Sequence, residues 1–159
     1  MRPAARDDFE IAIICAPLLE AAAVLDSLNQ RYDKDDSGYG KQEGDTNTYP
    51  TGQIGQHNVV LAHMPGIGIS SAARVASRLQ LSFRGIGLAL FVGACGGVPF
   101  DRSTPAIVPG DVVISTSVVE FDFGRRYPHH FRRKSGLKDT LGRPRTEIRE
   151  LVSKFEMVM

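Results

Sequence analysis

Three glycine-rich turns are the features of this chain best suited to chemistry. They are Pro65–Gly68, Gly93–Gly97 and Pro109–Asp111, and each adjoins an apolar run. Glycine has no side chain, so backbone N–H groups at such turns can approach an anion or a flat base closely. In open α/β sheets ligands bind at the carboxyl ends of the strands. The turns therefore predict a ligand pocket at one sheet edge, with simple tight strand–helix turns as the structural alternative.

The glycine spacing excludes two common nucleotide-binding motifs. Gly66 and Gly68 are followed by Ser71 where a dinucleotide fingerprint has its third glycine. No Gly-Lys-Ser/Thr follows any of the turns, which excludes a P-loop. Ser70 and Ser71 are predicted to cap a helix, whose N-terminus would add partial positive charge beside the turn.

The elements that must position these turns are short apolar runs alternating with helical patterns. Because most of the runs are apolar throughout, they predict strands buried on both faces, as in a largely parallel sheet. A turn at Gly55–His57 predicts one hairpin. We therefore expect an α/β fold, a mostly parallel, mixed sheet flanked by helices, in β-α-β-β-α-β order. The predicted strands are Ile11–Cys15, Thr48–Ile54, Asn58–Met64, Leu88–Val92 and Val112–Ser115, and the predicted helices are Ala16–Asn29, Ser70–Leu81 and Arg145–Phe155.

Length and composition set further bounds. With 159 residues, 42% hydrophobic and 23% charged, the chain has the make-up of one globular domain. We assign that domain to residues 8–159 and expect residues 1–7 to be a flexible N-terminus. No apolar run approaches the roughly 20 residues that span a bilayer, so we expect a cytoplasmic protein without a membrane partner. Two cysteines, Cys15 and Cys95, cannot form a disulfide framework and are expected to be buried thiols.

Four segments in order resemble the purine/uridine phosphorylase-like superfamily, which contains nucleoside phosphorylases and nucleosidases. A fifth segment looks like the fungal subgroup, in which this domain often precedes NTPase or ankyrin-repeat modules. The resemblance covers about residues 8 to 155. The four segments are Ile11–Leu25, Gly66–Ala73, Phe91–Pro99 and Gly110–Ser115, and the fifth is Val119–Gly124.

The resemblance implies cleavage of the N-glycosidic bond of a purine nucleoside or nucleotide. Phosphate, as co-substrate, or water attacks the anomeric carbon, and no other cofactor and no metal is implied. Glu20 matches the family glutamate that helps to position or activate the attacking water. Ala94 and Cys95 stand where many relatives carry a hydroxyl side chain, which leaves the choice between phosphate and water open. The residues that match substrate- and phosphate-binding positions are Gly66, Gly68, Gly93, Ala94, Gly96 and Gly97.

The resemblance also implies groups that the sequence does not show. The family's ribose-binding Met-Glu motif and its base-protonating aspartate do not appear before Met159. We therefore expect a C-terminally truncated form of the fold, with little activity of its own. The alternative is a catalytically inactive nucleoside-binding or regulatory module of a fungal multidomain receptor. Self-association into a homo-oligomer is also left open.

The segment Arg125–Arg145 is rich in arginine and lysine and carries Tyr127 and Phe131. It predicts a solvated loop over an active-site mouth, or alternatively a contact with nucleic acid. The net charge of only +1 favours the first interpretation. We accordingly expect no nucleic-acid partner. His63, in an apolar run, is expected to be a satisfied core or strand-end residue.

Overall fold

The computed structural model describes residues 1–16, 18–32, 38–96, 106–115, 122–134 and 145–157. The chain divides into two compact units, residues 1–96 and 97–159. Each unit is described by itself below. No helix among these described residues is long and apolar enough to cross a membrane.

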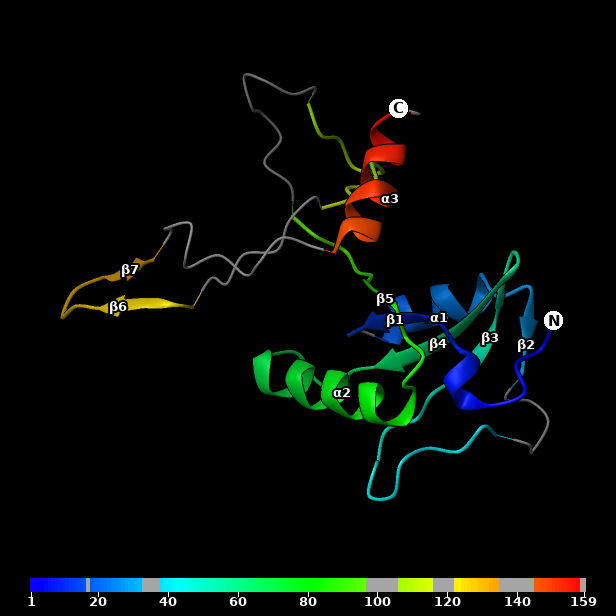
Figure 1. The fold of residues 1–159 in the computed structure, drawn as a ribbon. Helices are drawn as coiled ribbons and strands as arrows, with labels where there is room; N and C mark the ends of the chain where they lie inside the picture. The colour runs from blue at the N-terminus through cyan, green and yellow to red at the C-terminus, as the bar shows by residue number, and fades with distance from the viewer. Residues whose placement is uncertain (17, 33–37, 97–105, 116–121, 135–144, 158–159) are drawn as a thin grey trace. The chain divides into compact units, whose positions relative to one another are not determined.

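The first unit is built on a five-stranded mixed sheet in the order β2-β3-β4-β1-β5 (Figure 1). The central strand β1 runs parallel to β4 and to β5, whereas β3 is antiparallel to both β4 and β2. This is the mixed α/β sheet that the apolar runs predict, with the short β2 as an addition. The strand bounds are β1 Ile11–Cys15, β2 Gln30–Arg31, β3 Thr51–Ile54, β4 His57–His63 and β5 Leu88–Phe91.

Two helices cover opposite faces of this sheet (Figure 1). Helix α1, Leu18–Asp26, packs against the alternate residues of β1 that include Ile13 and Cys15. Helix α2, Ile69–Ser82, packs against the other face, which includes Ile14. Strand side chains alternate between faces, so a strand can be apolar throughout only if both faces are covered. The central strands meet that condition, and their burial confirms the prediction for β1 and β4.

Two of the predicted buried strands need correction. Leu88–Val92 does contain a strand, but Phe91 is 69% exposed and Leu90 is 40% exposed. Among the described residues β5 is an edge strand, and neither of the buried clusters beside α1 and α2 includes a residue of it. Val112–Ser115 is not a strand in the structure, and its side chains are exposed. An apolar run therefore shows that a segment is suited to burial, but it does not show whether another segment covers it.

Two local predictions are also wrong. Helix α2 begins after Gly68, with no side-chain hydrogen bond at its N-cap, so neither Ser70 nor Ser71 caps it. Gly68 has a φ of 126°, a backbone conformation that disfavours any residue with a side chain. Cys15 is buried as expected, but Cys95 is exposed.

A buried carboxylate anchors the segment before β3 to the end of α2. The side chain of Asp45 accepts hydrogen bonds from the Ser82 hydroxyl and the Tyr49 hydroxyl, each over 2.7 Å. It also accepts the backbone N–H of Asn47 over 2.9 Å. Burial raises the pKa of Asp45, but these hydrogen bonds and the charge of Lys41 outweigh burial and hold the pKa below its ordinary value. The anchored segment stabilises the face of the sheet that α2 covers.

The second unit contains two further strands and a helix. Strands β6, Gly124–Arg126, and β7, Phe131–Arg133, form an antiparallel hairpin. Helix α3 spans Thr146–Glu156, close to the predicted Arg145–Phe155. The hairpin corrects the loop interpretation of the basic segment.

Candidate active site

The carboxyl ends of three parallel strands bring the first two glycine-rich turns to one sheet edge. Cys15 pairs in register with His63 at the end of β4, and Ile14 pairs with Phe91 at the end of β5. The chain leaves β4 into Pro65–Gly68 and leaves β5 into the Gly93 turn. Parallel pairing thus converts distant sequence segments into neighbours.

Glu20 joins the α1 turn to the turn after β5. The backbone N–H of Ala94 donates to Glu20 Oε1 over 2.9 Å. The backbone N–H of Ala16 donates to Glu20 Oε2 over a longer 3.4 Å. Glu20 is half-buried, whereas the turn residues from Gly93 to Gly96 are exposed. A carboxylate fixed by two backbone donors beside an open turn keeps lone pairs free to accept a proton from a ligand or from water.

The absence of a side chain at Gly93 allows the Glu20 carboxylate to lie against this turn. A Cβ at position 93 would lie 2.9 Å from Glu20 Oε1 and 3.1 Å from Glu20 Oε2, so the Glu20 carboxylate would have to move away from the turn. A Cβ at Gly96 would meet nothing within 4 Å. Of the glycines in this turn, Gly93 therefore has a specific steric requirement. Gly97 lies outside the described residues.

The first turn supplies the start of α2 to the same edge. Gly66 and Gly68 are exposed, and a Cβ at either would meet nothing within 4 Å. The carbonyl of Gly68 accepts the first bond of the helix, from the N–H of Ala72 over 3.0 Å. The N–H groups of the first turn, Ile69 to Ser71, precede that bond and have no partner within the helix. They give this edge partial positive charge.

Two polar groups at this edge were not identified as site residues from the sequence. His63 Nε2 and Ser71 Oγ are buried atoms without a hydrogen-bond partner among the described residues. His63 ends β4 as expected, but its Nε2 is not satisfied as expected. An unpaired buried polar group costs about 1–3 kcal/mol. The only sequence signal was position, since both residues flank the Gly66 turn.

Cys15 is the last residue of β1 and lies at the same sheet edge, but its thiol is not a candidate nucleophile. Burial raises the pKa of its thiol, and the negative charge of Glu20 raises the pKa further. The thiol therefore stays protonated at neutral pH, where a nucleophilic cysteine must be a thiolate. Among the described residues, no cluster of His, Cys, Asp and Glu side chains could hold a metal ion.

The third glycine-rich turn belongs to the second unit. Asp111 holds it closed, because its Oδ2 accepts the N–H of Val108 over 2.9 Å and its own N–H donates to the Val108 carbonyl over 3.1 Å. Asp111 thus supports its own loop.

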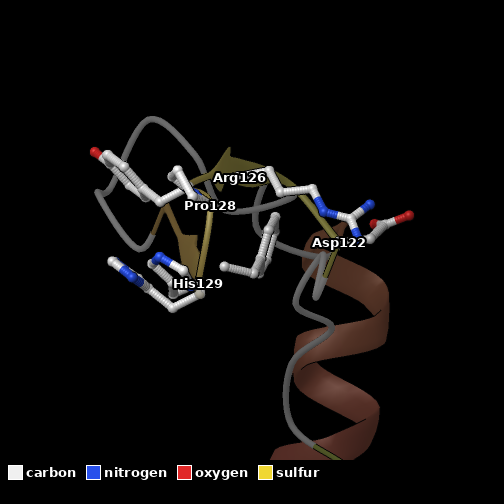
Figure 2. Close-up of a pocket in the computed structure, with 8 residues that line it drawn as sticks. Asp122, Arg126, Pro128 and His129 are labelled. Atoms are coloured by element: carbon white, nitrogen blue, oxygen red, sulfur yellow. The ribbon is translucent and has the colours of Figure 1, made fainter.

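Two open hollows are found among the described residues. One, of about 630 Å³, is on the β6–β7 hairpin, where Figure 2 shows the Arg126 side chain extending toward Asp122. The other, of about 580 Å³, is lined by the N-terminal residues Arg2–Asp7 together with Gly38 and Tyr39. Glu20 lines neither hollow.

Comparison with known proteins shows the family of the chain. The chain is 32% identical over 138 residues to a nucleotide-binding leucine-rich repeat (NLR)-like protein of Hyaloscypha variabilis. The match covers 81% of this chain but only 13% of that relative. No solved structure matches the chain. The family model of the phosphorylase superfamily matches residues 10–153, nearly the whole of both units. The chain therefore belongs to the phosphorylase superfamily.

Proposed function

We propose that the edge holding Glu20 binds a purine nucleoside or nucleotide and serves cleavage of its N-glycosidic bond. The observation that carries the proposal is the contact between Glu20 Oε1 and the Ala94 N–H. It joins the turn after β1 to the turn after β5 at an exposed position. Membership in the phosphorylase superfamily supports this reaction class.

The attacking group in this proposal is oriented by Glu20. A water molecule donates a hydrogen bond to the carboxylate, and its oxygen attacks the anomeric carbon. The C–N bond breaks, and its electron pair leaves with the base, which then takes up a proton from solvent. The water's proton passes to Glu20, as a general base accepts it. A carboxylate also stabilises the positive charge that develops on the sugar in the transition state.

The first turn of α2 is proposed to bind the anionic or hydroxyl part of the ligand. Its N–H groups and partial positive charge suit a phosphate, whether free or carried by a nucleotide. The Ser71 hydroxyl and the His63 imidazole lie at the same edge and have unused hydrogen-bonding capacity. Phosphate as the attacking group is therefore compatible with this arrangement, as is water.

A calorimetric comparison of two glycine variants tests the proposal. Gly93→Ala is expected to weaken inosine or AMP binding at least about tenfold, because its Cβ displaces the Glu20 carboxylate. Gly96→Ala is the matched control in the same turn, with open space around its Cβ, and is expected to bind like the unchanged chain. Titrations with and without phosphate show whether an anion shares the site. If the unchanged, folded chain bound none of these ligands, the proposal would be wrong.

A further inference from the structure

The register of the β6–β7 hairpin places rings and cations on one face. Arg125 pairs directly with Arg132. Two positions nearer the hairpin turn, the Tyr127 and His130 rings stack with centroids 4.8 Å apart and planes inclined by 15°. In the other direction, Lys134 Nζ lies 4.8 Å from the centre of the Phe123 ring.

These three pairs share a face because residues two apart in a strand point the same way. Backbone hydrogen bonds extend the ladder to both outer pairs, from the Lys134 N–H to the Phe123 carbonyl over 3.0 Å and from the Tyr127 N–H to the His130 carbonyl over 2.8 Å. All six residues are exposed. Along this face, called the ladder face below, a ring and a cation are followed by two cations and then by two rings. The three pairs are Phe123 and Lys134, Arg125 and Arg132, and Tyr127 and His130.

The charge on this face is not balanced by the hairpin itself. Like charges directly opposite in an antiparallel pair destabilise the pair, so Arg125 beside Arg132 is unfavourable without an anion. The opposite face carries Arg126 and Arg133. There the Arg126 side chain extends toward Asp122, the one acidic residue from 122 to 134 (Figure 2). The ladder face has no carboxylate among its described residues.

We infer that the ladder face of the hairpin binds single-stranded nucleic acid. Such a strand offers phosphates to cations and unpaired bases to ring faces, which is how sequence-tolerant single-strand sites are built. An acidic peptide would use the arginines and the lysine but would gain nothing from the stacked rings. The ring component therefore favours nucleic acid over other polyanions, even though the whole chain has a net charge of only +1.

Fluorescence anisotropy with the full chain tests the inference, using labelled oligo-dT and oligo-U of about 15 nucleotides. Three cations on the face predict a salt slope near about −2, so affinity falls about 20-fold between about 50 mM and about 200 mM salt. The double variant Arg125→Gln/Arg132→Gln is expected to weaken binding at least about tenfold and to make the slope shallower. It also removes a like-charge pair, so the hairpin should remain folded. The two oligonucleotides distinguish DNA from RNA as the preferred strand.

The matched control removes the same charge from the opposite face. Arg126→Gln/Arg133→Gln is expected to change affinity less than about threefold, because charges on the other face are partly screened. Tyr127→Ala is expected to weaken binding about tenfold through lost stacking. The inference is overturned if neither oligonucleotide binds, if a polyglutamate peptide of equal charge binds as well, or if the two double variants lose affinity equally. Circular dichroism of each variant excludes unfolding as the cause.

Discussion

Replacement of Glu20 by glutamine is expected to lower the rate of base release from inosine or adenosine, already low in this chain, by up to about 10²–10⁴-fold, the usual contribution of a positioned general base. Glutamine has nearly the same shape, and its carbonyl oxygen can still accept the Ala94 N–H that Glu20 Oε1 accepts over 2.9 Å. The variant therefore keeps the turn but cannot take a proton from water. Chromatographic measurement of free base over time, with and without phosphate, gives the rate.

The control for this variant is the same change at the other end of β1. Glu10 precedes β1 at its amino end, and its side chain is exposed, so Glu10→Gln is expected to leave the rate unchanged. Equal rates for Glu20→Gln and the unchanged chain would exclude Glu20 as the base. A phosphate requirement for the unchanged chain would identify phosphorolysis rather than hydrolysis.

Truncation of Phe83 to alanine is expected to lower the free energy of unfolding by about 3–5 kcal/mol, as deletion of a buried aromatic ring does. The side chain is only 1% exposed. Its ring meets Phe9 and Tyr49 edge-on, with centroids 5.7 Å and 5.2 Å away. Because small domains are stable by about 5–15 kcal/mol, the variant is expected to be close to unfolding. Urea denaturation followed by circular dichroism measures the change.

An exposed residue of the preceding helix provides the comparison. Leu81 on α2 is 56% exposed, so Leu81→Ala is expected to change the unfolding free energy by no more than about 0.5 kcal/mol. Similar losses for Leu81→Ala and Phe83→Ala would mean that the cluster around Phe83 is not the core of this face.

The central sheet could be predicted from the sequence because its strands are buried on both faces. The run Ile11–Cys15 is apolar throughout and the run Asn58–Met64 is mostly apolar, and β1 and β4 lie at these positions between α1 and α2. Leu88–Val92 has the same composition but lies at the sheet edge. Composition reports how apolar a strand is, whereas its coverage depends on which other segments pack there.

The β6–β7 hairpin could not be predicted by the same reasoning. Its strands carry arginine where a half-buried strand would carry apolar residues, so the usual alternation signal is missing. The pairing of Arg125 with Arg132 appears only in the register. Rings and cations recur at every second residue of the sequence. This pattern indicates that they share one face only when the register of the hairpin is known.

The candidate site could be predicted in part. Glu20 and the turn at Gly93 were both expected at the carboxyl ends of parallel strands, and the structure places them in contact. The steric requirement at Gly93 and the unsatisfied Nε2 of His63 depend on distances in three dimensions. No spacing rule in the sequence carries that information.

Titration of the isotope-labelled chain with inosine and with phosphate, followed by backbone amide NMR, tests the proposed site most directly. We expect the amide signal of Ala94 and those of Ile69 to Ser71 to shift with saturation, because these N–H groups lie at the strand ends that would hold the ligand. Signals of Ile54 and His57, which pair at the amino end of β4, should stay in place with inosine. Unchanged signals for Ala94 and the first turn of α2 at saturating ligand would contradict a nucleoside site at this edge.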